Sequence, residues 1–329
     1  MELTTVWFLL IAVLWTGYLL LEGFDFGVGV LLPFVGRDEA GRRMALRAIG
    51  PLWDGNEVWL LVAGGATFAA FPEWYATLFS GFYLPLFLIL LALIARGVAL
   101  EYRNRSEDPR GWDRALFWGS AVPAFLWGVA FANIVRGVPL DGDHEYTGSL
   151  LTLLNPYALL GGVATLALFT LHGAVFLALK TTGEVRGRAL VAIRYAGPAA
   201  LAAGGVFLVV TQFMTGKPAT WISVTAAAAG IAGALVAAAR GREGWAFLAN
   251  AVAIVAVVVT LFGGLWPNVM PALDPANSLT VANASSTPYT LTVMTWVAVI
   301  FTPIVLIYQG WTYWIFRERL TRTDVAGSH

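Results

Sequence analysis

Nine apolar runs, each long enough to cross a lipid bilayer as a helix, dominate this sequence. The hydrocarbon core of a bilayer is about 30 Å thick and an α-helix rises about 1.5 Å per residue, so one crossing needs roughly 20 apolar residues. The predicted spans are 5–33, 50–70, 75–100, 115–138, 153–180, 195–214, 220–239, 245–265 and 289–316. Because the loops between them are short, we expect an all-α integral membrane protein without a soluble catalytic domain.

The composition agrees with a membrane protein and excludes several other classes. Hydrophobic residues make up 58% of the chain and charged residues only 12%, whereas soluble domains average about 45–50% and about 25%. The chain has no cysteine, which excludes a disulfide scaffold, a cysteine metal site and a cysteine nucleophile. With 20 basic and 20 acidic side chains the formal net charge is zero, so no nucleic-acid partner is expected.

The basic residues predict how the chain is oriented in the membrane. If the nine spans alternate in direction, 17 of the 20 Lys and Arg residues fall on one side, 2 on the other, and Arg96 lies within a span. Short loops rich in Lys and Arg stay in the cytoplasm. The sequence therefore predicts an N-terminus outside and a C-terminus in the cytoplasm, which requires an odd number of spans.

Acidic residues inside the first three spans are the most informative feature of the chain. Glu22 and Asp25 lie in the first span and Asp54 and Glu57 near the start of the second; each pair is three residues apart and so shares one helix face. Glu101 follows at the end of the third span. Burying an ionisable group in a bilayer costs about 2.5–3.5 kcal/mol or more, so these acids require an explanation.

Two interpretations of the acidic group remain open. In the first, Arg96 pairs with one carboxylate and the group only fixes how the helices pack. In the second, the acids form a path that conducts protons from the cytoplasm into the membrane, which we favour because one arginine cannot neutralise four carboxylates. Trp53 and Asn56, beside Asp54, are predicted to support this path together with Arg96, and Gly23 and Gly27 form a GxxxG pair that permits close helix packing.

Two further groups could hold a metal or a haem, and a structural role is the simpler explanation for each. His172 is the only histidine within a predicted span, which excludes bis-histidine haem ligation inside this chain; we expect a hydrogen-bonded packing residue. Asp141, Asp143, His144 and Glu145 cluster in an outer loop. We expect a solvated acidic turn there, with a metal site as the alternative.

Several motifs resemble subunit II of the cytochrome bd quinol oxidases, and they run from the first span to the last. The sequence WDGNEVW at Trp53–Trp59 is the most specific of them. The others are Glu22–Gly29, Ala63–Pro72, Phe79–Tyr83, Leu154–Pro156 and Leu291–Ala298.

The resemblance implies an architecture of nine transmembrane helices as two four-helix bundles plus one peripheral helix. A weak repeat agrees, because Leu21-Glu22-Gly23 and Leu171-His172-Gly173 are 150 residues apart. The corresponding units are 1–138 for the first bundle, 139–265 for the second, and 266–329 for an outer loop, the ninth span and a cytoplasmic tail.

The resemblance also implies the function, a subunit of a quinol:O2 oxidoreductase in the bacterial plasma membrane. The expected partner is subunit I, which in this family holds haem b558, haem b595 and haem d; quinol and O2 are the substrates of the complex. Subunit II is associated with support of the haem b595/d centre and with part of the proton path, and the matching acids here are Asp25, Asp54 and Glu101, with Glu22 beside them. A structural quinone and small accessory subunits are left open.

A proton-coupled secondary transporter or channel is the alternative function. It would use the same acids to couple proton movement to a solute. Transporters typically have inverted repeats and helices broken near the midplane, whereas the weak repeat here is parallel, because an offset of four spans preserves direction. The sequence therefore favours the oxidase subunit.

Overall fold

The computed structural model describes residues 2–326, and most of them are helical. The helices are α1 (Leu3–Val35), α2 (Glu39–Ile49), α3 (Trp53–Ala70), α4 (Pro72–Gly81), α5 (Tyr83–Tyr102), α6 (Arg110–Arg136), α7 (Leu150–Leu153), α8 (Pro156–Lys180), α9 (Gly183–Thr215), α10 (Thr220–Ala239), α11 (Glu243–Leu265), α12 (Pro288–Ile315) and α13 (Arg322–Ala326). Two 3₁₀ turns, η1 (Arg103–Arg105) and η2 (Pro275–Asn277), and two short antiparallel strands, β1 (Asn268–Met270) and β2 (Leu279–Thr280), complete the described chain.

Among the described residues, eight helices are long and apolar enough to cross a membrane. They are α1, α5 with η1, α6, α8, α9, α10, α11 and α12. This confirms an all-helical, multi-pass membrane protein. The predicted span 50–70 corresponds to α3, a helix of 18 residues that is not among the eight. Its first turn carries Asp54, Asn56 and Glu57, which lower its hydropathy.

The structure corrects the boundaries of several predicted spans. The run predicted as 75–100 is divided at Phe82 into α4 and α5. The span predicted as 195–214 is the second half of α9, which begins at Gly183. Before α3 the chain forms α2, which the span analysis missed because α2 is amphipathic rather than apolar and has no run of the required length.

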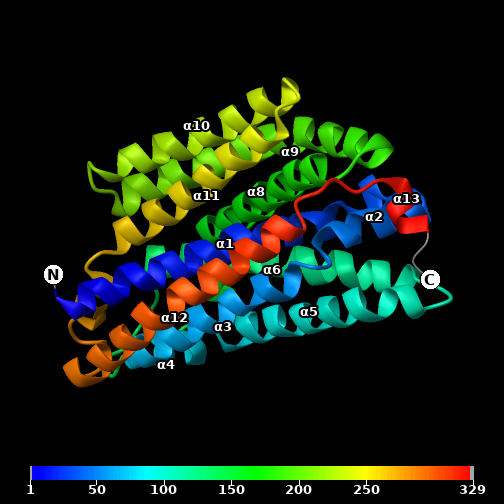
Figure 1. Ribbon diagram of the computed structural model, residues 1–329. Helices are drawn as coiled ribbons and strands as arrows, with labels where there is room; N and C mark the ends of the chain where they lie inside the picture. Colours follow the sequence, from blue (N-terminus) through cyan, green and yellow to red (C-terminus); the bar gives the residue numbers. More distant parts are fainter. Residues whose placement is uncertain (1, 327–329) are drawn as a thin grey trace.

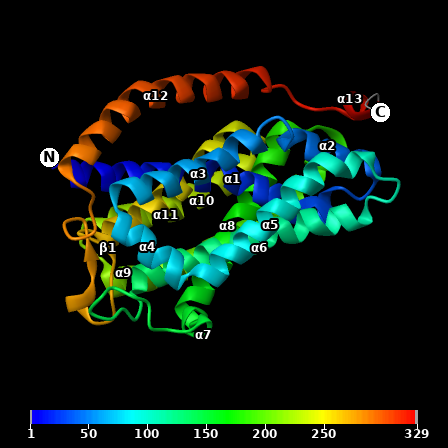
Figure 2. The ribbon, with the colours of Figure 1, turned by 90° about the horizontal axis from the view of Figure 1, so that it is seen from below.

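The long helices run side by side along one axis (Figures 1 and 2). α1, α6 and α8 pack against one another at the centre; α3 lies on α1 and α5 on α6. α9 and α11 pack against α8, and α10 packs on α11 and α9. Figure 2 shows α12 at the periphery, and only Leu291 of its 28 residues is buried. α2 and α13 lie at one end of the bundle and the start of α1 at the other. We call the former the basic end, since Arg42, Arg103 and Arg322 lie there.

The predicted close packing at the GxxxG pair is confirmed, and the partner is α8. A Cβ on Gly27 would lie 1.9 Å from the carbonyl oxygen of Phe169, and one on Gly173 would lie 2.3 Å from the carbonyl carbon of Gly27. A Cβ on Gly23 would meet the ring of Phe169 at 2.8 Å. α1 and α8 therefore cross in direct backbone contact, which brings α8 against the helix that carries Glu22 and Asp25.

Candidate functional site

Glu22 and Asp25 lie at the centre of the molecule, on the part of α1 where every residue from Glu22 to Gly29 is buried. Both carboxyl side chains are completely inaccessible to solvent. The helices that surround them contribute the polar partners: α5 contributes Arg96, α3 contributes Asn56 and α12 contributes Tyr313. Four helices thus meet at the acidic group.

Arg96 forms an ion pair with Glu22, as the packing interpretation expects for one of the carboxylates. Both side chains are essentially unexposed, and the guanidinium also lies 4.9 Å from the centroid of the Phe26 ring. The backbone of Gly119 on α6 packs against Arg96, since a Cβ there would lie 2.7 Å from the Arg96 Cβ. The arginine therefore joins α5 to α1 in a tightly packed setting.

Asp25 is bound by an amide rather than by a cation. The Asn56 side-chain amide donates a hydrogen bond of 2.7 Å to Asp25 Oδ2. Asn56 Oδ1 accepts a hydrogen bond of 2.7 Å from the Tyr313 hydroxyl and a longer one, 3.4 Å, from the Gln309 amide. Gln309 Oε1 in turn accepts from the Trp59 indole N–H at 2.7 Å. A continuous polar chain therefore links α1, α3 and α12.

Three polar atoms at this site have no hydrogen-bond partner within the described residues. They are Glu22 Oε2, Asp25 Oδ1 and Arg96 Nη2, all buried. Buried polar groups are nearly always hydrogen-bonded, so the two carboxylate oxygens have unused capacity to hold a proton or accept from a water molecule, and Arg96 Nη2 has an unused donor. An ion pair that only fixes helix packing would not need these unpartnered polar atoms.

The structure brings only part of the predicted site together. Glu22, Asp25, Asn56 and Arg96 are buried neighbours, and Glu57 is half-buried on the same helix as Asn56. Asp54 at the start of α3 and Glu101 at the end of α5 are exposed. Neither forms an ion pair or a side-chain hydrogen bond within residues 2–326.

Three residues that contact this site were missed by sequence analysis. Gln309 and Tyr313 are one turn apart on α12 and so face the same neighbour, and Trp59 binds Gln309. A glutamine four residues before a tyrosine in an otherwise apolar span was the available signal. Trp53, predicted to support the site, packs beside Gly97 on α5 instead.

His172 is a packing residue with both ring nitrogens engaged, as predicted. Nε2 lies 3.1 Å from the carbonyl oxygen of Leu20, which can only accept, so Nε2 carries the proton. Nδ1 then accepts from the Asn250 side-chain amide at 3.1 Å. The ring is fully buried and stacks on Phe247 with a centroid distance of 4.7 Å. This neutral imidazole fastens α8 to α1 and α11.

The acidic loop is a hydrogen-bonded turn, as expected. Asp141 Oδ1 accepts from the backbone N–H groups of Asp143 and Glu145, at 3.1 and 2.9 Å. His144 occupies the left-handed region with φ of 61°. No cluster of three or more metal-ligating His, Cys, Asp or Glu side chains occurs within the part of the chain that the structure describes.

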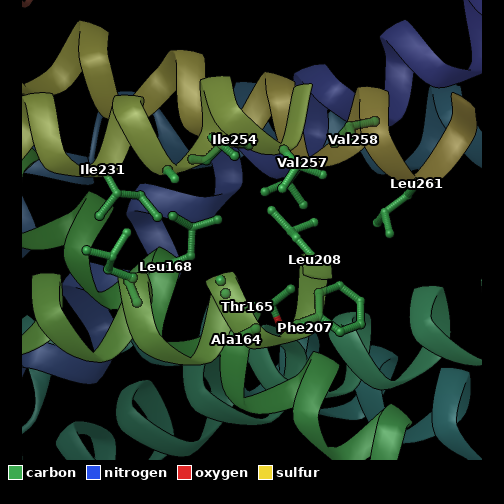
Figure 3. Close-up of a pocket in the computed structure, with 18 of the residues that line it drawn as sticks. Ala164, Thr165, Leu168, Phe207, Leu208, Ile231, Ile254, Val257, Val258 and Leu261 are labelled. Atoms are coloured by element: carbon green, nitrogen blue, oxygen red, sulfur yellow. The ribbon is translucent and has the colours of Figure 1, made fainter. Parts of the chain in front are cut away.

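A cavity of about 120 Å³ lies among α8, α9, α10 and α11 (Figure 3). Leu168, Leu208 and Ile254 face it from three different helices. Its lining is apolar except for Thr165, whose hydroxyl donates within the protein to the carbonyl oxygen of Ala124 at 2.7 Å. The lining thus has no free donor for the carbonyl oxygens of a quinone head group, and it suits only apolar occupants.

Ion pairs close the basic end of the bundle. The guanidinium of Arg103 makes two hydrogen bonds to Glu39, at 3.0 and 2.9 Å, and a third of 2.6 Å to Asp113. The bonds from Arg103 hold the pKa of the Glu39 carboxyl below its ordinary value. Arg322 of α13 pairs with Asp38, so the C-terminal segment is fastened across this end.

Comparison with known proteins identifies the family. Residues 3–316 match the family model described as cytochrome bd terminal oxidase subunit II. The chain belongs to this family. It is 39% identical to a cytochrome bd ubiquinol oxidase subunit 2 of Bacillus subtilis, over 98% of both chains. It is 35% identical to a cytochrome bd-I ubiquinol oxidase subunit 2 of Escherichia coli, over 97% of this chain and 96% of that one.

The fold has a counterpart among solved structures. A chain in the structure of bd oxidase from Geobacillus thermodenitrificans superposes with a TM-score of 0.80 over 96% of this chain and 99% of that one. Their sequence identity is only 14%, so this likeness concerns the fold alone. The full-length matches to oxidase subunits do not favour the transporter alternative.

Proposed function

We propose that this chain is subunit II of a bacterial cytochrome bd-type quinol oxidase and supplies part of the proton path for the reduction of O2 to water. The supporting observation is the position of Asp25, which is fully buried yet hydrogen-bonded to Asn56 on the helix that also carries exposed Asp54. The chain's role in the complex is thus proton delivery and support of a haem b595/d centre held by subunit I.

The proposed path enters at Asp54 and ends at Asp25. Asp54 and Glu57 are one turn apart on α3, exposed and half-buried respectively, and Asn56 between them binds Asp25. Reduction of one O2 to two waters consumes four protons, and neighbouring carboxyls can pass them inward. Asp25 Oδ1, which has no hydrogen-bond partner within the described residues, provides a place where a proton can be held. Glu101 lies near the entrance, at the end of α5.

The proposed direction of proton uptake depends on orientation. The basic end carries the arginines that the positive-inside rule retains in the cytoplasm. Because α13 and the start of α1 lie at opposite ends of the bundle (Figure 1), we infer an odd number of membrane crossings. Eight apolar spans alone would give an even number, so we infer that α3 is a ninth crossing.

The partner subunit is proposed to cover the outer face of α3 and α5. On α3 this face contains Asp54, Val58, Leu61 and Phe68, all exposed; on α5 it includes Ile94, Val98 and Glu101. Carboxylates facing lipid would each cost about 2.5–3.5 kcal/mol or more. A protein surface that hydrates or pairs Asp54 and Glu101 removes this cost, so the face fits subunit I better than lipid.

The haems are assigned to the partner. His172 does not fit a haem ligand, because both its nitrogens are hydrogen-bonded and its ring lies against Phe247. A structural quinone does not fit the apolar cavity, whose lining lacks free polar groups for the quinone head group.

The division of the chain into units 1–138, 139–265 and 266–329 stays a prediction.

The oxidase assignment predicts the pigment of the purified complex. We expect the tagged chain, extracted in mild detergent, to co-purify with a second hydrophobic polypeptide and to carry haem. An absorption spectrum of the reduced sample is expected to include a far-red band from haem d. A colourless, single-chain preparation that is still folded, as shown by its resistance to heat and protease, would contradict the oxidase assignment and favour the transporter alternative.

Photo-cross-linking tests the proposed partner face. Because this chain has no native cysteine, a thiol-reactive probe attaches to it only at an introduced cysteine. A benzophenone attached at Leu61→Cys on α3 is expected to capture the second polypeptide. The same probe at Ile222→Cys on α10, which is also exposed but on another face, is expected not to. Capture at Ile222 alone would place the partner elsewhere and refute the proposed face.

A further inference from the structure

A second hollow lies at the basic end, away from the acidic group and the apolar cavity. It is a groove of about 480 Å³ between the end of α1, the start of α2 and the first two turns of α6. Its lining consists of Pro33, Phe34, Arg42, Arg110, Asp113, Arg114, Phe117 and Trp118. The proposed proton path and the proposed partner face use none of these residues.

The groove has an excess of positive charge. Its only carboxylate, Asp113, is already bound by Arg42 at 2.8 Å and by Arg103 at 2.6 Å. Arg110 lies 3.8 Å from Asp108, and both of these side chains are mostly exposed. Arg114 forms no ion pair within residues 2–326. Two exposed guanidiniums are therefore available to an anion.

The other wall of the groove is aromatic. Phe34 and Trp118 are each 62% exposed, although both are large and apolar. On α6 the order along one face is Arg110, Arg114 and then Phe117 with Trp118, so the charges lie at the helix end and the aromatic rings one turn nearer to the apolar span. Trp and Phe next to basic residues at a span end are typical of the boundary between lipid head groups and hydrocarbon.

We propose that this groove binds the phosphodiester head group of an anionic phospholipid. Arg110 and Arg114 contact the phosphate, since guanidinium groups match phosphate oxygens in a bidentate geometry. The acyl chains continue past Phe117 and Trp118 along α6. The combination of a cationic rim and an apolar wall distinguishes such a lipid from a soluble phosphate, which would use only the rim. This site is independent of the proposed proton path.

Titration of the purified, delipidated complex with phosphatidylglycerol, followed by native mass spectrometry, tests the site. We expect the double variant Arg110→Gln/Arg114→Gln to bind about thirtyfold more weakly, since each basic side chain near an anionic lipid contributes about a fivefold factor. The matched control is Arg240→Gln/Arg242→Gln, which removes two exposed arginines from the turn between α10 and α11. It is expected to bind within twofold of the unaltered chain.

Two further arms distinguish the source of the anion. Trp118→Ala is expected to weaken phosphatidylglycerol binding several-fold, and millimolar inorganic phosphate is expected not to displace the lipid. Equal binding of phosphatidylglycerol by the Arg110/Arg114 variant would overturn the site. An equal loss of binding in the Arg240/Arg242 control would show only general attraction between charges and would refute a specific site. Displacement of the lipid by inorganic phosphate would show that the groove binds a soluble anion instead.

Discussion

Asp25→Asn is expected to lower the oxidase turnover of the complex by about tenfold or more while the subunit still folds and assembles. An asparagine keeps the shape of the side chain and can still accept the 2.7 Å hydrogen bond from Asn56. It cannot take up and release a proton, and a positioned acid or base typically contributes a factor of about 10²–10⁴ to a step that needs proton transfer. The measurement is quinol-dependent O2 consumption by purified complex, compared at equal haem content.

Matched variants separate this effect from a structural one. Asp25→Glu, which restores a titratable group, is expected to recover part of the turnover. Glu73→Gln removes an exposed acid near the start of α4, at the other end of the bundle from α2, and is expected to leave turnover unchanged. Normal turnover with a normal haem spectrum in Asp25→Asn would show that no obligatory proton passes through this carboxyl.

Arg96→Met is expected to be the most destabilising single change at the site. It leaves the Glu22 carboxylate buried without its cation, and removing one partner of a buried ion pair costs about 3–5 kcal/mol. We expect little full-length subunit in the membrane and a clear fall in the thermal midpoint of the complex. The measurement is the amount of tagged chain in isolated membranes, followed by fluorescence-detected chromatography after heating.

A compensating variant shows whether the ion pair is structural. Glu22→Gln/Arg96→Met removes both charges, and such paired replacements are frequently neutral or stabilising. We expect the double variant to recover most of the lost subunit, with Asp25-dependent turnover retained. A double variant as unstable as Arg96→Met would mean that these side chains do more than neutralise each other, and loss of turnover in a stable double variant would place Glu22 on the proton path.

The contacts of the individual acids bear differently on the two interpretations of the sequence. Glu22 behaves as the packing interpretation expects, since it forms an ion pair with Arg96. Asp25, Asp54 and Glu57 have no cationic partner within the described residues, as the proton-path interpretation requires. Spacing along α1 could not assign Arg96 to Glu22 rather than Asp25, because both carboxyls share one helix face.

The sequence alone predicted the multi-pass helical class, the acids in the first three spans and the resemblance to the oxidase subunit. These properties depend on local quantities: the length of apolar runs, the charge of loops and the identity of short motifs. The sequence did not predict the break between α4 and α5 at Phe82 or the amphipathic helix α2. It also did not predict that α12 contributes Gln309 and Tyr313 to the acidic site.

Only the tertiary structure decided which polar side chains meet. Asn56 and Tyr313 are separated by 257 residues, yet they share a hydrogen bond because α12 packs against α3. Gly27 and Gly173 likewise meet because two distant helices cross without side chains between them. The physical reason is that a helix's period determines which residues share its face, whereas the neighbour of that face depends on how all the helices pack together.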